Sequence, residues 1–173
     1  LPRIFPDAAS ENRAIAVSTI GARSSFTVHM VRDLPDVHLW VDDTPCFPEF
    51  VYDTTSSETS STLFGELGDG AAGGDEAEGR RHNVTDHALA LYRGLDSTIQ
   101  KDDIFHYVYG ILHSSDYRAV FASDLKKSLP RIPQVGTAED FWAFSKAGRE
   151  LADLHTEYES VEPWSDLTYT YAP

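Results

Sequence analysis

The chain of 173 residues has few cysteines, no long apolar run and long stretches without basic side chains. Its single cysteine, Cys46, excludes an internal disulfide and any zinc site built from several cysteines. No apolar run approaches the roughly 18 residues of a membrane span, and the start lacks the charged and apolar regions of a signal peptide. We therefore expect a cytoplasmic protein in a reducing environment. The absence of an initial Met suggests a piece of a longer polypeptide.

Basic charge is scarce, with 14 Lys and Arg against 28 Asp and Glu and a net charge of -14. Such a balance argues against a free-standing nucleic-acid binder, because phosphate contacts require Lys and Arg. The acids are concentrated, however. Residues 53–79 carry seven acids and residues 150–173 carry six, with no Lys or Arg in either segment. Residues 80–149 carry ten basic and eight acidic side chains, so the middle of the chain is mildly basic.

The first 52 residues favour short strands. Phe26, Val28 and Met30 alternate with Thr27, His29 and Val31, the period of two that is typical of a half-buried strand. Pro45 and Pro48 predict an irregular turn between two later strands, because Pro cannot serve in a central strand. The predicted strands are residues 13–20, 26–31, 38–43 and 49–53.

An acidic insertion of low complexity follows, with 53–82 as its predicted bounds. Its first 27 residues, 53–79, are rich in Ser, Thr, Gly and acid, and Leu63, Phe64 and Leu67 are the few side chains able to bury much surface. Such a composition cannot offset the entropy of ordering the chain. We expect a loop or a largely disordered segment.

Residues 83–158 have a helical period. Asn83 or Thr85 is suited to cap a helix that runs to about Gly94. Apolar residues from Ile104 to Leu112 form one stripe of a second helix, and Ser114 or Ser115 caps a third that Pro130 ends. Thr137 with Asp140 resembles a capping box and opens a long fourth helix. The prediction is a single α+β domain of residues 1–173, with a small antiparallel sheet, the insertion, a helical half and a tail at 159–173.

No group of residues amounts to a predicted catalytic site. His106 and His113 lie seven residues apart, which is wider than the spacing usual for metal ligands on a helix, and we interpret them as flanking the apolar stripe. Cys46, between two prolines, is interpreted as a buried thiol. A small hydrolase or metal enzyme that uses His106, His113 or Cys46 remains an alternative.

Several separated blocks resemble a known family. "NRAIAVSTIGARSSFTVHMVRDLPDVHL", "CFPEFVY", "DIFHYVYGILHSSDYRAVFASDLKKSLPRIP" and "FWAFSKAGRELADLH" are similar, in order and spacing, to the C-terminal specificity region of type ISP restriction–modification enzymes. These are single polypeptides that combine a nuclease, a helicase-type ATPase and an adenine methyltransferase with a target-recognition domain. The resemblance covers nearly the whole chain outside residues 53–79.

The resemblance implies a target-recognition domain without catalytic activity of its own. Its partners would be double-stranded DNA and the methyltransferase and helicase domains of the same polypeptide. No cofactor is implied for this region, whereas the whole enzyme would use S-adenosylmethionine, ATP and magnesium. An alternative is a module for protein interaction or interdomain docking that does not touch DNA, in which the acidic insertion and the aromatic tail bind a basic partner.

Two short segments are the predicted DNA contacts, because Arg and small polar side chains read base edges and fix the register on phosphates. One lies in the first turn and the other where the insertion meets the first helix. Lys126 and Lys127 are interpreted as solvated surface. The candidate residues are Arg23, Ser24, Ser25, Arg80, Arg81, His82 and Asn83.

Overall fold

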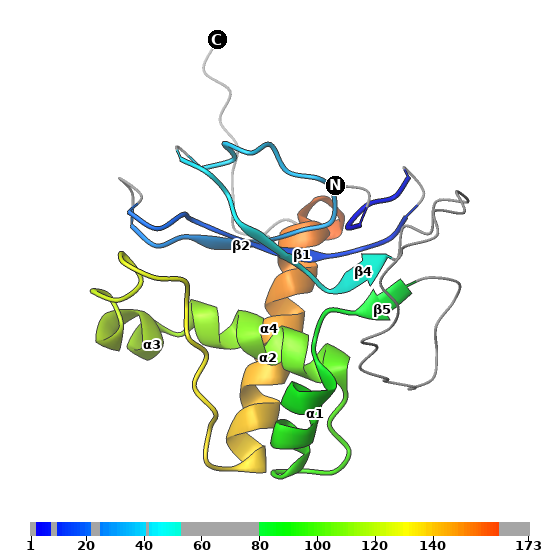
Figure 1. The fold of residues 1–173 in the computed structure, drawn as a ribbon, viewed down its shortest axis with the longest axis vertical. Helices are drawn as coiled ribbons and strands as arrows, with labels where there is room; N and C mark the ends of the chain where they lie inside the picture. The colour runs from blue at the N-terminus through cyan, green and yellow to red at the C-terminus, as the bar shows by residue number, and fades with distance from the viewer. Residues whose placement is uncertain (1–2, 8–9, 22–24, 41, 53–79, 163–173) are drawn as a thin grey trace, which may run out of the picture.

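The computed structural model describes residues 3–7, 10–21, 25–40, 42–52 and 80–162. A layer of short strands lies across one side of a group of helices (Figure 1). One sheet has the order β2-β1-β3, all antiparallel, and β4 pairs with β5 in a second sheet. The strands are β1 (Ala14–Val17), β2 (Val28–Val31), β3 (Cys46–Pro48), β4 (Phe50–Tyr52) and β5 (Arg80–His82). The helices are α1 (Asp86–Arg93), α2 (Lys101–His113), α3 (Ser115–Val120), α4 (Ala138–Thr156) and the short 3-10 helix η1 (Tyr158–Ser160).

The predicted α+β class is confirmed, and strands β1 and β2 follow from their sequences. All four residues of β1 are buried, as expected of the middle strand of three. In β2, Val28 and Met30 are buried and His29 and Val31 are half-buried, which confirms the predicted alternation. The apolar face of this sheet packs on α2 and α4.

Two strand predictions were wrong in detail. Residues 38–40 and 42 form turns and bends, because the Asp36 carboxylate accepts a hydrogen bond from the His38 backbone N–H at 2.7 Å and favours a turn there. The Pro-flanked segment, predicted as an irregular turn, contains strand β3. It lies at the sheet edge, which is where a strand tolerates Pro.

The predicted helix starts are confirmed by their caps. The Thr85 hydroxyl accepts from the Ala88 N–H at 3.2 Å, and the Thr137 hydroxyl accepts from the Asp140 N–H at 3.1 Å. Ser114 caps α3 in the same way. Each cap satisfies a backbone donor that has no partner within the first helical turn.

The third helix is shorter than predicted. The sequence suggested a helix up to Pro130, but α3 ends at Val120 and residues 121–127 form successive turns. These turns contain hydrogen bonds three residues apart, from the Asp124 N–H to Phe121 O and from the Lys127 N–H to Asp124 O. Ser123 and Asp124 disfavour a helix interior, since their side chains compete for backbone groups.

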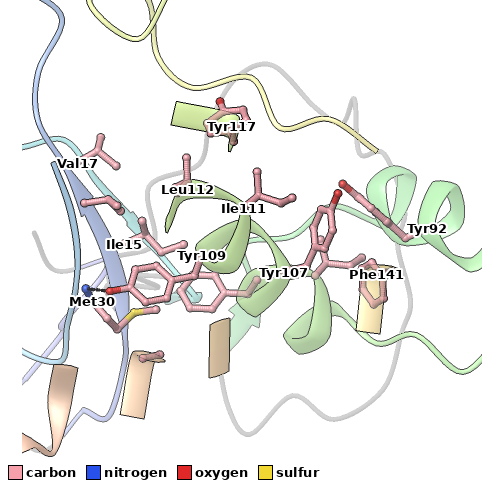
Figure 2. Packing of buried hydrophobic residues seen from close by; sticks show 14 of the residues in the cluster. Ile15, Val17, Met30, Tyr92, Tyr107, Tyr109, Ile111, Leu112, Tyr117 and Phe141 are labelled. Carbon is pink, nitrogen blue, oxygen red and sulfur yellow. Dashed lines mark hydrogen bonds between the residues drawn. The ribbon is translucent and has the colours of Figure 1, made fainter. Parts of the chain in front are cut away.

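Helix α2 is buried on two sides rather than along one stripe. Tyr109 points toward the sheet, where its hydroxyl accepts a hydrogen bond from the Met30 N–H at 2.8 Å (Figure 2). Tyr107 points the other way and stacks on Phe141 of α4, with ring centres 4.9 Å apart, beside Tyr92 of α1 (Figure 2). The stretch "DIFHYVYGILH" is therefore the central element of the core.

Helices α2 and α4 approach closely where each has a glycine. A Cβ atom at Gly148 would collide with the His106 carbonyl oxygen and lie 2.7 Å from the Gly110 nitrogen. A Cβ atom at Gly110 would collide with the Phe144 carbonyl oxygen. The backbones can meet at this distance only because both side chains are hydrogen atoms.

Candidate functional site

The two predicted clusters lie at opposite ends of the molecule (Figure 1). Ser25 is in the connection between β1 and β2, on the side of α3, whereas Arg80–His82 form β5 at the other end. Arg23 and Ser24 lie outside the described residues, and Ser25 is exposed. Ser25, the described member of the first cluster, therefore does not share a compact site with Arg80–His82.

The β5 cluster has a definite geometry. Arg80 and His82 pair with Tyr52 and Phe50 of β4, so they belong to a sheet and not to a disordered insertion as their place within 53–82 suggested. The Arg80 guanidinium lies 3.6 Å from the centre of the Phe50 ring, and the His82 ring centre lies 4.3 Å from it. The cation–π contact and the ring contact hold both side chains in place.

The neighbouring residues differ in exposure. Arg81, between Arg80 and His82, points to the other side of the strand and is exposed. Asn83 is also exposed, and its backbone N–H donates to the Glu49 carbonyl at 2.8 Å. Burial lowers the pKa of His82, so this ring is neutral at pH 7. Arg81 and Asn83 are thus the two members of this cluster that face solvent.

A charged network, which the sequence did not predict, lies beneath β4 and β5. Asp102, near the start of α2, accepts from Arg149 Nη2 at 2.6 Å, and Arg149 also reaches Asp103 at 3.1 Å. His106 Nδ1 lies 2.9 Å from the Asp102 carbonyl and 3.1 Å from its carboxylate. Since both partners are acceptors, Nδ1 carries a hydrogen and donates.

Glu49 completes this network as a buried carboxyl group. Burial, and after it the neighbouring Asp102, raises its pKa to about 7, despite the opposing charges of His106 and Arg13. Burial also acts to raise the pKa of Asp102, but hydrogen bonds from His106 and Arg149 hold it well below its ordinary value. Asp102 is therefore ionised, and Glu49 carries the proton of their shared hydrogen bond below pH 7.

The sequence held only weak signals for this network. Asp102 and Asp103 stand at a helix start, where acids are common for reasons of capping and the helix dipole. Glu49 is an acid between aliphatic and aromatic neighbours, but nothing local predicts its contact with Asp102, 53 positions later. The network therefore depends on tertiary contacts.

Three histidines meet at the other end of α2. The ring centres of His29 and His155 are 4.3 Å apart, and those of His113 and His155 are 5.5 Å apart. The Tyr109 hydroxyl hydrogen-bonds to His155 Nδ1. Burial lowers the pKa of all three rings, and for His113 burial and the nearby charge of Arg118 lower it to about 4. These rings are neutral packing groups at pH 7.

The residues of the enzyme alternative do not gather into a reaction centre. His106 is buried against Asp102, and His113 packs against Tyr109 and His155. Burial raises the pKa of the Cys46 thiol, which disfavours the reactive thiolate. Within the described ranges, no three His, Cys, Asp or Glu side chains are placed to hold a metal ion. None of the described helices has the length and apolar character of a membrane span.

Several solved structures are similar to this chain. Among solved structures, a DrdV–DNA complex is 33% identical, with a TM-score of 0.74 over 94% of this chain and 14% of that chain. A nuclease-deletion mutant of the type ISP restriction–modification enzyme LlaGI, in complex with a DNA substrate mimic, is 32% identical, with a TM-score of 0.67 over 95% and 12%. The ATP-dependent type ISP enzyme LlaBIII bound to DNA is 28% identical, with a TM-score of 0.68 over 94% and 9%.

No curated protein matches the chain. It spans 14% or less of the length of the three solved structures. The family described as the type ISP C-terminal specificity domain matches residues 1–173, as the separated sequence blocks predicted. The chain belongs to this family of type ISP specificity domains.

Proposed function

We propose that this chain recognises the DNA target sequence for a type ISP restriction–modification enzyme and directs methylation and cleavage by other domains. The observation that carries the proposal is the family match over the whole chain, joined to three similar structures that all contain DNA or a DNA mimic. The working location would be the cytoplasm. S-adenosylmethionine, ATP and magnesium would serve the other domains.

In this proposal the exposed polar residues read DNA. Arg81 and Asn83 project from the end of β5, and Arg and Asn are the side chains best suited to bidentate contacts with guanine and adenine. Ser25, with Arg23 and Ser24 before it, would provide contacts from the connection between β1 and β2. Arg80 and His82 would act indirectly, because Phe50 holds them.

A domain exchange tests the function. We would replace the specificity domain of a type ISP enzyme with this chain and map the protected and methylated bases. The proposal expects that the modified sequence changes with the exchanged domain. Modification of the original sequence by an active hybrid would contradict it.

A substitution within such a hybrid tests the β5 cluster. Arg80→Ala combined with Arg81→Ala should lower methylation of the cognate site, since a bidentate contact contributes about 1–3 kcal/mol of discrimination. Lys146→Ala, on the exposed surface of α4, is the control and should leave methylation unchanged. Unchanged methylation in the double variant would remove this cluster from the DNA contacts.

A second candidate, docking of a basic protein surface, is favoured by one specific region. Residues 29–35, Leu39, the end of α4 and η1 line a hollow of about 560 Å³ that exposes Leu34, Leu39 and Tyr158. Asp33, Glu157 and Glu159 line it together with a single arginine, Arg32, so acidic side chains predominate and disfavour contact with DNA. A footprint that did not change with the exchanged domain would favour docking over DNA reading.

A further inference from the structure

The end of the molecule formed by α3 and the turns after it has the most concentrated positive charge among the described segments. Residues 117–135 contain four basic side chains and one acid, although the chain as a whole is strongly acidic. The four basic residues are Arg118, Lys126, Lys127 and Arg131. Sequence periodicity placed the lysines on a regular helix, whereas the structure places them on a series of turns.

The charges at this end are not neutralised by neighbours. In the part of the chain that the structure describes, the side chains of Lys126, Lys127 and Arg131 form no ion pair, and all three residues are exposed. Several basic side chains elsewhere do form ion pairs. Arg13 binds Asp153 at 2.9 Å, and Arg32 binds Glu157 at 2.8 Å.

The segment is anchored, so its charges have fixed positions. The Tyr117 hydroxyl donates to the Arg131 carbonyl at 3.1 Å, which joins the two ends of the segment, and Leu125 is buried between them. The Gly21 N–H donates to the Lys126 carbonyl at 3.0 Å. This bond ties the turns to the residues that follow β1, where Gly21 has the positive φ of 74° that favours glycine.

The surface also exposes apolar groups next to the charges. Val120 is 72% exposed and Leu129 is 41% exposed. A hollow of about 240 Å³ opens here, and Phe121, Ser128 and Arg131 contribute to its lining. Deoxyribose presents an apolar face between charged phosphates, and this surface offers the complementary arrangement.

From this arrangement we infer that residues 118–131 bind the phosphate backbone of duplex DNA, with Lys126, Lys127 and Arg131 as the contacts. The inference deepens the proposed function and rests on it. Binding here places the connection between β1 and β2, with the exposed Ser25, beside the duplex. Phosphate contacts set orientation and register, whereas base contacts provide sequence discrimination.

The test is fluorescence anisotropy of the 173-residue chain with a labelled 30-base-pair duplex across a salt series. Each phosphate contact contributes about 0.9 to the slope of log affinity against log salt. Lys126→Ala with Lys127→Ala should therefore reduce that slope by about 1.8 and weaken binding at low salt about tenfold or more. Circular dichroism and thermal melting verify that the variants are folded.

The matched control is Lys146→Ala beside the single variant Lys127→Ala. Both remove one exposed positive charge, but Lys146 lies on α4, is 80% exposed and stands 4.0 Å from the Glu150 carboxylate. Lys127→Ala should weaken binding and Lys146→Ala should not. Equal losses would show a general effect of net charge and overturn the inference.

The remaining outcomes separate the inference from the proposed function. Wild-type binding that survives in the double lysine variant, but is lost in Arg80→Ala with Arg81→Ala, would overturn the inference and leave the function in place. Absence of wild-type binding at about 20 mM salt, where phosphate contacts are strong, would overturn the inference, whereas the domain exchange decides the proposed function.

Discussion

The β5 end and the α3 end of the molecule both carry basic side chains, but they use them differently. At the β5 end, Arg80 lies on Phe50 and Arg149 is held by Asp102 and Asp103. At the α3 end, Lys126, Lys127 and Arg131 project from anchored turns without carboxylate partners among the described residues. The comparison teaches that net charge describes this domain poorly. Pairing decides which positive charges remain to meet a ligand.

Helix α2 links the two ends. Its N-terminal turn contains Asp102, beneath β5, and its last residue, His113, leads into α3. Burial shifts the pKa in opposite directions at the two ends. It raises the pKa of the Glu49 carboxyl group and lowers that of the His113 imidazole. Four predictions test the comparison, from the largest expected effect to the smallest.

The first prediction concerns the contact between α2 and α4, on which both ends of the molecule depend. Gly148→Ala forces α2 and α4 apart, because the added Cβ meets the His106 carbonyl oxygen. We expect a loss of about 1–3 kcal/mol of stability or more, measured by urea unfolding. Gly136→Ala is the control, since a Cβ there meets nothing within 4 Å. Equal stability of the two variants would show that the crossing tolerates a side chain.

The second prediction distinguishes the roles of the two ends by removing one guanidinium from each. Arg149→Leu leaves Asp102 and Asp103 without their partner and should lower stability by about 1–2 kcal/mol, after discounting for solvent exposure. Arg131→Ala should leave the melting temperature unchanged and weaken DNA binding. If Arg131→Ala were the more destabilising variant, the assignment of a structural role to Arg149 and a binding role to Arg131 would be wrong.

The third prediction concerns His113 at the α3 end. Its pKa is about 4 in the folded chain, because of burial and the charges of Arg118, His155 and His29, and about 6.5 when unfolded. The unfolded chain therefore binds the proton first, so this contribution to stability is complete above pH 6.5 and is lost as the pH falls toward 4. The melting temperature of the His113→Phe variant should fall less than that of the wild type between pH 7 and pH 5. Parallel curves for the two proteins would contradict this assignment.

The fourth prediction concerns Glu49 at the β5 end and has the opposite sign. Its pKa rises from 4.5 to about 7 on folding, so the protonated group contributes fully below pH 4.5 and its contribution is lost as the pH rises through 7. Glu49→Gln keeps the side chain neutral. Its melting temperature relative to wild type should therefore increase by a few degrees from pH 6 to pH 8.5. A difference that stays constant with pH would show that Glu49 is already ionised at pH 6.

Local rules were enough for part of this fold. Thr85, Ser114 and Thr137 marked the starts of helices because a cap requires only a side chain and the next three backbone N–H groups. The alternation around Val28 and Met30 located β2 for a similarly local reason. The order and spacing of the sequence blocks predicted the family, and the match over residues 1–173 confirmed it.

Tertiary structure decided the rest, because those features depend on residues far apart in the chain. Strand β5 exists because Arg80–His82 find β4 as a partner, and α2 is buried on two sides because the sheet and α4 approach it from different directions. The pKa of Glu49 is raised because folding buries it beside Asp102. Which lysines and arginines remain unpaired was likewise settled in space, since an ion pair forms only when folding brings opposite charges within a few ångströms.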